Sequence, residues 1–267
     1  MTARSAYLGA SFVIAAVCAN GESLIPPLPE IQISALLEGM PSFQQRNIEF
    51  IGGGKSFCGP TAASNALMWL ADRGYPALKP SAKNDSSAQK EMIKRLAELM
   101  GTYRASTSLT SFTCGINSYL RTVGYAPKSW VLSGNGCANH GLPPPDITVV
   151  RSMLSGSTVM WFSLGWYCLD ESSRKYTRDF GHWVTLVGYG RNRKGVADPD
   201  CFVIADPESP DGYQYITFKM LTEGRIGNGS SRVDAKGYFN VVELNIQLAD
   251  RSPKYCLLES IQALTIK

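Results

Sequence analysis

The chain has 267 residues, of which 44% are hydrophobic and 18% are charged, so it is long and apolar enough to bury a full core. Its 26 basic and 22 acidic residues leave a formal net charge of +4 without a long run of either sign, which gives no reason to propose nucleic acid as a partner. These properties predict one globular domain.

The first 19 residues have the features of a signal peptide. Arg4 precedes an apolar stretch at residues 7–17, and Val17-Cys18-Ala19 fits cleavage after Ala19. The stretch is shorter than the about 20 residues of a membrane-spanning helix. We therefore expect residues 1–19 to be removed and the protein to be secreted or periplasmic/extracellular, without stable membrane insertion. A retained anchor and a lipid anchor on Cys18 are the alternatives, although Val17 stands where a lipoprotein signal has a small residue.

The remaining chain divides into an extended segment and a domain. Residues 20–50 are rich in proline and are expected to be extended, whereas residues 51–267 are expected to form the domain. Apolar residues at helical spacing predict a helix between Gly59 and Gly74, a second ending near Gly101, and a third over residues 109–123. The N-terminal half therefore has a helical pattern.

The pattern changes after a proline-rich loop at residues 135–145 and a short helix that Asp146 can cap. Short runs of β-forming residues follow at residues 158–164, 182–189, 201–205, 213–218 and 238–244. Helices followed by strands predict an α+β fold, in which the helical half packs on an antiparallel β-sheet half and a cleft lies between them.

Six cysteines remain if Cys18 leaves with the signal peptide, and an exported protein can form disulfides. If one thiol must stay free to react, at most two intrachain bridges can form. The sequence does not fix the pairing. Pairs of Cys114 with Cys137 and of Cys168 with Cys201 would each bracket a segment that needs tethering.

Cys58 lies in the sequence SFCGPT at residues 56–61, at the start of the first predicted helix. The free N–H groups and the positive dipole end of a helix favour a thiolate, which is the nucleophilic form of cysteine. Gly59 leaves room for a substrate carbonyl, and the Cys58 N–H is placed to bind the oxyanion formed on attack. This arrangement predicts a nucleophile.

A nucleophilic cysteine needs a base, and the chain has only His140 and His182. His140 lies in a loop, whereas His182 begins a predicted strand, which is a more rigid platform. The next predicted strand ends at Asp206, which two adjacent antiparallel strands would bring next to His182 to orient its ring.

Each of these residues also has a structural interpretation. Cys58 can be a buried thiol or half of a disulfide, His182 a core histidine, and Asp206 the start of a turn before Pro207. Cys137 and His140 have a spacing that could bind zinc, but no second pair of ligands stands at metal-site spacing, so no metal is implied.

The Cys-Gly-Pro-Thr helix start, the Gly-His strand and the downstream Asp-Pro resemble the papain-like cysteine peptidase superfamily, in particular the C39-like peptidases. The resemblance covers residues 58–70 and 181–207. It implies a papain-like fold with the active site in the cleft between helices and sheet. It also implies a glutamine that supplies a second oxyanion donor, and the segment PSFQQ at residues 41–45 offers Gln45, with Gln44 as the alternative. The spacing from this glutamine to the cysteine is longer than in papain.

Together these features predict an exported cysteine peptidase that hydrolyses peptide or amide bonds through a thioester acyl-enzyme, with a peptide or protein substrate and no cofactor. In this interpretation Cys58 attacks, His182 transfers the proton and Asp206 holds His182. An acyltransferase or amidase would use the same residues. A non-catalytic secreted binding protein is the alternative from another class, and the oligomeric state is left open.

Overall fold

A computed structural model describes residues 34–103, 106–134, 143–209, 212–227, 233–244 and 255–267. The predicted signal peptide at residues 1–19 lies outside these ranges. Ile31–Lys267 form one compact unit, so the second half of the predicted extended segment at residues 20–50 belongs to the folded domain. Residues 35–36 add a short strand to it, in which Ala35 pairs with Tyr189.

Helices form in the N-terminal part where the apolar spacing predicts them. Two of them begin at side-chain caps, because Asn84 accepts a hydrogen bond from the Ser87 N–H and Ser108 accepts one from the Ser111 N–H. The helical elements are η1 (Ile51–Gly54), α1 (Cys58–Ala71), η2 (Pro76–Leu78), α2 (Asp85–Leu99), α3 (Leu109–Thr122) and α4 (Thr148–Met153). None of the described helices is long and apolar enough to cross a membrane.

The strands are longer and more numerous than the sequence pattern predicts. Each predicted strand overlaps one in the structure, but a long strand at residues 255–266 was not predicted. The strands are β1 (Ala35–Leu36), β2 (Pro127–Gly134), β3 (Thr158–Asp170), β4 (Lys175–Arg191), β5 (Ala197–Ala205), β6 (Tyr213–Met220), β7 (Arg225–Ile226), β8 (Val233–Asp234), β9 (Phe239–Val242) and β10 (Tyr255–Ile266).

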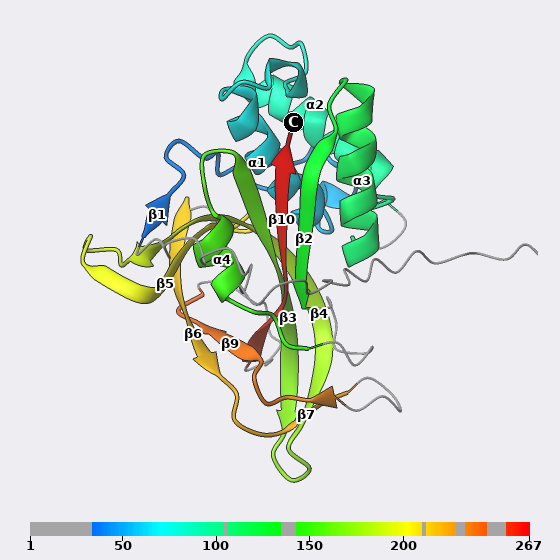
Figure 1. Cartoon of the computed structure of the whole chain (residues 1–267). Helices are drawn as coiled ribbons and strands as arrows, with labels where there is room; N and C mark the ends of the chain where they lie inside the picture. The colour runs from blue at the N-terminus through cyan, green and yellow to red at the C-terminus, as the bar shows by residue number, and fades with distance from the viewer. Residues whose placement is uncertain (1–33, 104–105, 135–142, 210–211, 228–232, 245–254) are drawn as a thin grey trace, which may run out of the picture. The chain divides into compact units, whose positions relative to one another are not determined.

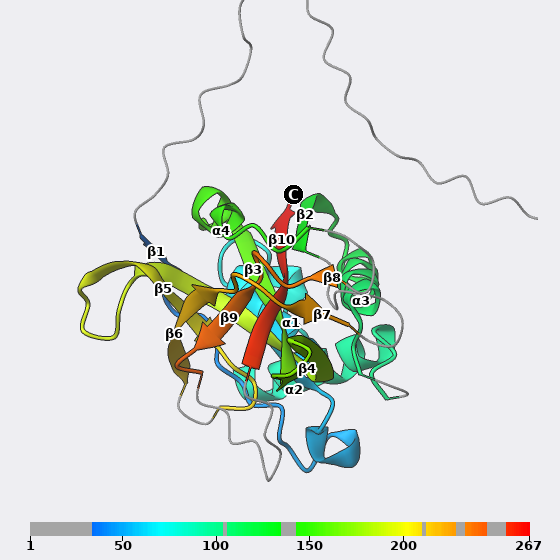
Figure 2. The same ribbon diagram turned by 90° about the horizontal axis from the view of Figure 1, so that it is seen from below.

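Six of these strands close into an antiparallel barrel, in the order β3-β4-β5-β6-β9-β10 and back to β3 (Figure 1). β10 closes the ring because it pairs with β9 through Leu257 and Leu258 and with β3 along nearly its whole length. β2 pairs with the end of β10, and β1 and β7 pair with β4. Figure 2 shows the same strands from below.

The predicted papain-like α+β fold, with a helical half packed on a sheet half, is therefore wrong. The described residues contain only four α-helices, and most of the domain is the closed barrel with its additional strands. The physical reason is β10. Without this strand the predicted sheet had two open edges and needed a separate helical half to cover it, whereas a closed barrel has no edge and buries its own interior.

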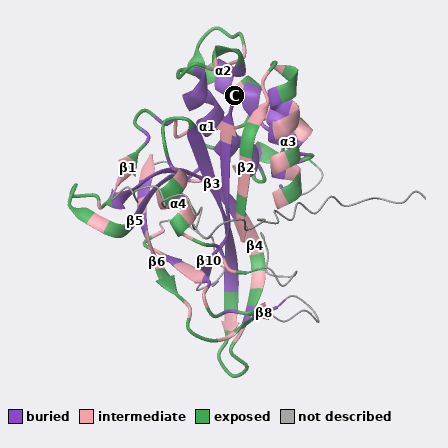
Figure 3. Ribbon diagram, viewed as in Figure 1, coloured by how far each residue is buried: buried purple, intermediate pink, exposed green. Residues whose placement is uncertain are grey.

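Aromatic side chains fill part of the barrel. Phe162 on β3 contacts Phe202 on β5 and Phe218 on β6, with ring centroids 6.3 and 5.8 Å apart. Since β3 and β6 are not neighbours in the ring of strands, these contacts cross the interior. Figure 3 shows that the central parts of the long strands are buried.

Helix α1 packs on strands β3 and β4 at one end of the barrel, and α2 and α3 pack on α1 and on each other (top in Figure 1), whereas α4 contacts β10. The ring of Trp183 stacks on Phe112 of α3, with centroids 4.0 Å apart. Two side chains, Trp161 Nε1 and Thr185 Oγ1, donate hydrogen bonds of 3.0 and 2.8 Å to the Ala62 carbonyl of α1. These contacts fix α1, and with it the start of this helix, relative to β4.

Candidate active site

Cys58 is the first residue of α1 and is half-buried. The helix has no side-chain cap at Phe57, and its first backbone hydrogen bond runs from the Thr61 N–H to the Phe57 carbonyl. Pro60 has no N–H, so the Cys58 and Gly59 N–H groups are the donors that the helix geometry leaves without an intrahelical acceptor. The sulfur therefore lies beside two N–H groups at the positive end of the helix dipole.

His182 and Asp206 meet across neighbouring strands. His182 lies in β4, Asp206 follows the last residue of β5, and these strands pair antiparallel. The His182 Nε2 atom lies 2.6 Å from the Asp206 Oδ1 atom, and the two side chains are 8% and 0% exposed. The predicted contact between imidazole and carboxylate is thus present.

The Asp206 carboxylate is held by two further donors. The Glu208 N–H donates a 2.8 Å hydrogen bond to Oδ1, and Gln214 Nε2 on β6 donates a 3.1 Å hydrogen bond to Oδ2. Each carboxylate oxygen therefore has a fixed partner. The sequence interpretation missed Gln214. The available signal was a lone amide in the β-forming run YQYITF at residues 213–218, eight residues after Asp206.

Cys58 also interacts with the His182 ring and shifts its pKa. Burial, the largest single effect, lowers the pKa of His182, whereas the charge and hydrogen bond of Asp206, followed by those of Cys58, raise it and together outweigh burial. Together they raise the pKa of His182 to about 10. Because Nε2 bonds Asp206, Nδ1 is the ring nitrogen left to face the sulfur. The three side chains form one chain of contacts from sulfur to imidazole to carboxylate.

Gln45 is buried beside the same site, but its amide has other partners. Its Nε2 donates hydrogen bonds of 3.1 and 3.2 Å to the carbonyls of Gly54 and Lys55, and its backbone N–H donates a 2.8 Å bond to the Pro207 carbonyl. Gln44, the alternative, is exposed and contacts the Ser209 carbonyl at 3.5 Å. Gln45 is thus close to the site, with both side-chain N–H groups engaged.

Aromatic and small residues surround the three side chains. Trp166 meets the His182 ring edge-on, with centroids 5.9 Å apart. Trp183, the next residue, donates a 2.9 Å hydrogen bond from Nε1 to the Thr107 carbonyl. Thr107 also lies against Gly59, where a Cβ atom would come within 2.8 Å of the threonine Cβ. Thr107 therefore contacts residues adjacent to both Cys58 and His182.

The predicted disulfide between Cys168 and Cys201 is not formed, since both residues have free thiols. Cys201 is buried and Cys168 is exposed. In the predicted pair of Cys114 with Cys137, Cys137 lies outside the described residues, as does His140. Within the described ranges, no three His, Cys, Asp or Glu side chains gather as a metal site would require.

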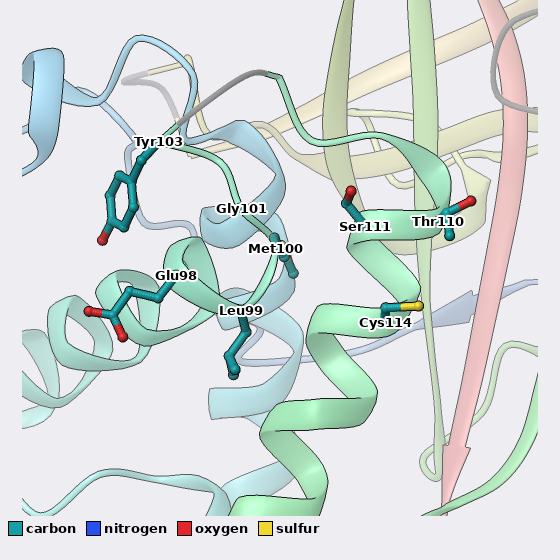
Figure 4. A pocket seen from close by; sticks show the side chains of 8 residues that line it. All are labelled: Glu98, Leu99, Met100, Gly101, Tyr103, Thr110, Ser111 and Cys114. Carbon is teal, nitrogen blue, oxygen red and sulfur yellow. The ribbon is translucent and has the colours of Figure 1, made fainter.

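Two open hollows lie elsewhere on the described surface. One, of about 640 Å³, lies between the end of α2 and the start of α3 and includes Tyr103 and Cys114 (Figure 4). The other, of about 530 Å³, lies beside Arg193 and Glu243. Neither contains the Cys58, His182 and Asp206 side chains, so the hollows do not mark the candidate site.

Comparison with known proteins places the chain in no family. No protein-family model matches the sequence, and no curated protein matches it.

Proposed function

We propose that this protein is a cysteine-dependent hydrolase of peptide or amide bonds, with Cys58 as nucleophile, His182 as general acid and base, and Asp206 as the residue that orients His182. The observation that carries the proposal is the interaction of one buried imidazole with both a carboxylate and a thiol. A structural core histidine needs no charged or nucleophilic partner, whereas this ring joins a carboxylate to the only thiol at a described helix start.

The first half-reaction forms an acyl-enzyme. With the proton of the Cys58 thiol on His182, the sulfur attacks the carbonyl carbon of the substrate, and the carbonyl oxygen becomes an oxyanion. The N–H groups of Cys58 and Gly59 at the helix start are available to stabilise this charge. His182 then gives its proton to the leaving nitrogen, the C–N bond breaks, and a thioester remains on Cys58.

The second half-reaction releases the acid. His182 accepts a proton from water as the water oxygen attacks the thioester carbon, and the C–S bond breaks as the proton returns to the sulfur. Throughout, Asp206 stays hydrogen-bonded to Nε2, which keeps the ring oriented and stabilises its charged form. The full carboxylate coordination by Gln214 and the Glu208 N–H supports this role.

The substrate of the proposal is a peptide or protein outside the cell, because the first 19 residues have the features of an export signal. Export and removal of residues 1–19 are parts of the proposal that can be checked separately, by sequencing the N-terminus of the mature protein.

The test compares wild-type protein with C58A on a broad library of fluorogenic peptides. We expect cleavage by the wild type and none by C58A, and stoichiometric loss of wild-type activity with iodoacetamide. C168A is the matched control, because it removes a free exposed thiol that lies on β3 rather than at a helix start. Activity that persists in C58A overturns the proposal. A wild-type Cys58 that fails to react with iodoacetamide in the folded, reduced protein does the same and favours a binding protein.

A further inference from the structure

Gln45 connects the two parts of the chain that carry the candidate site. Its backbone N–H donates a 2.8 Å hydrogen bond to the carbonyl of Pro207, the residue after Asp206. Its side chain donates to the carbonyls of Gly54 and Lys55, which lie four and three residues before Cys58. Gln45 therefore bonds both the residue that follows Asp206 and the segment that precedes Cys58.

The side-chain amide has no hydrogen left to offer a substrate. A glutamine amide carries two N–H donors, and here they go to two backbone carbonyls at 3.1 and 3.2 Å. The Gln45 side chain is 2% exposed, and its Oε1 atom is buried without a hydrogen-bond partner in the described structure. This orientation of the amide suits a link between segments and not the binding of an oxyanion.

The packing at this link is close enough to require glycine. Gly54 has φ +78°, in the left-handed region, and a Cβ atom there would lie 1.8 Å from the Gln45 carbonyl oxygen. The Gly54 carbonyl in turn accepts a 3.0 Å hydrogen bond from the N–H of Phe57, the residue that precedes Cys58. The position of Gln45 is thus transmitted through two hydrogen bonds to the start of α1.

We infer that Gln45 is a positioning residue that holds the start of α1 at a set distance from Asp206, so that the Cys58 sulfur and the His182 ring stay in contact. The inference rests on the proposed function and replaces the oxyanion role expected from the sequence. Loss of the link lets the segment before Cys58 move relative to β5, which weakens the pairing of thiolate with imidazolium.

Alkylation by iodoacetamide separates the two roles, because it requires the thiolate but forms no oxyanion. We expect Q45M to lower the rate of Cys58 alkylation at pH 6 by about tenfold to about 100-fold, as small misplacements of catalytic groups do. The pH at which alkylation reaches half of its maximal rate should also rise. Q262M is the matched control, since Gln262 is equally buried but bonds Thr113 of α3, away from the site. It should leave the pH profile of alkylation unchanged.

Each outcome decides between the roles. If Q45M loses peptide cleavage but keeps the wild-type alkylation profile, Gln45 acts on the oxyanion and the inference is overturned. If wild-type Cys58 is itself unreactive, the proposed function fails before Gln45 is tested.

A second pair of variants covers the case in which Q45M does not fold. G54A disrupts the same link, because its methyl group would clash with the Gln45 carbonyl. G52A introduces similar backbone strain, at φ +63°, but no atom lies within 4 Å of its added methyl group. We expect G54A to lower the rate of Cys58 alkylation as Q45M does. We expect G52A to alkylate at the wild-type rate. Unfolding of both Q45M and G54A, judged by circular dichroism, would show that the link serves stability and would overturn the inference.

Discussion

Gln214 donates a 3.1 Å hydrogen bond to Oδ2 of Asp206, the carboxylate oxygen that does not face His182. The Asp206 carboxylate is fully buried, and this bond and that of the Glu208 N–H prevent it from rotating away from the ring. The strand β6, which carries Gln214, therefore takes part in the geometry of the site even though it carries none of the three proposed catalytic residues.

The charge of Asp206 should control the ionisation of His182. Burial lowers the pKa of His182, but the Asp206 carboxylate and Cys58 together outweigh burial and raise it from the ordinary 6.5 to about 10. We expect D206N to lower this pKa, because burial is then opposed only by Cys58, and to abolish peptide cleavage. The titration of the His182 ring by NMR, with His140 replaced to simplify assignment, measures the change. An unchanged pKa in D206N would contradict the assigned contact.

The same shift makes stability depend on pH. A histidine whose pKa is raised on folding stabilises the folded state fully below its unfolded pKa, near 6.5, and this contribution is lost as pH rises through the folded value of about 10. Between these values we expect the midpoint of urea unfolding to fall in the wild type and to fall less in D206N. Equal slopes in the two proteins would show that His182 is not the responsible group.

The G59A substitution should destabilise the protein, because the added methyl group would clash with Thr107. An added Cβ would lie 2.8 to 2.9 Å from three side-chain atoms of Thr107, and such overpacking costs about 1–3 kcal/mol. We expect G59A to lower the free energy of unfolding by this amount and to slow alkylation of Cys58. T107G removes the three contacting atoms, so G59A should cost less in a T107G background. Additive effects in this double-mutant cycle would rule out the contact.

The described cysteines should separate into reactive and protected groups. Burial raises the pKa of Cys201 to about 11, with the charges of Asp198 and Glu243 adding to it, and burial raises the pKa of Cys256 well above its ordinary value. At pH 8 we expect iodoacetamide to label Cys58, then the exposed Cys114 and Cys168, and to spare the buried pair until the protein is unfolded. Peptide mapping by mass spectrometry gives the order. Early labelling of Cys201 would contradict its burial.

The partly buried ion pair of Arg178 with Glu259 should be costly to break from one side. Arg178 donates hydrogen bonds of 2.6 and 2.9 Å to Glu259, which is 2% exposed and also accepts a 2.6 Å hydrogen bond from Tyr167. R178A leaves this carboxylate buried and uncompensated, which costs about 3–5 kcal/mol. E259Q should cost less, because an amide oxygen still accepts from Tyr167 and the arginine is partly in solvent. Urea unfolding measures both, and a larger cost for E259Q would contradict this assignment.

Short-range sequence patterns were enough to predict three helices, five strands and the three candidate catalytic residues of this protein. Helical spacing and capping residues placed α1, α2 and α3, and β-forming runs marked five strands, because these signals depend on residues close together in the chain. Cys58 at a helix start, His182 in a strand and Asp206 after the next strand were also identifiable, since adjacent antiparallel strands must bring their ends together. The contact of His182 with Asp206 follows from these short-range rules, whereas the approach of Cys58 depends on the packing of α1 on the strands.

Only the tertiary structure decided how the sheet closes and what Gln45 does. β10 pairs with both β3 and β9, partners separated from it by very different lengths of chain, and no local pattern specifies such pairings. The donors of Gln45 are likewise taken by Gly54, Lys55 and the Pro207 carbonyl because the folded chain brings these segments together. Residue type and spacing predict which groups can react, whereas long-range packing decides which of those groups are free to do so.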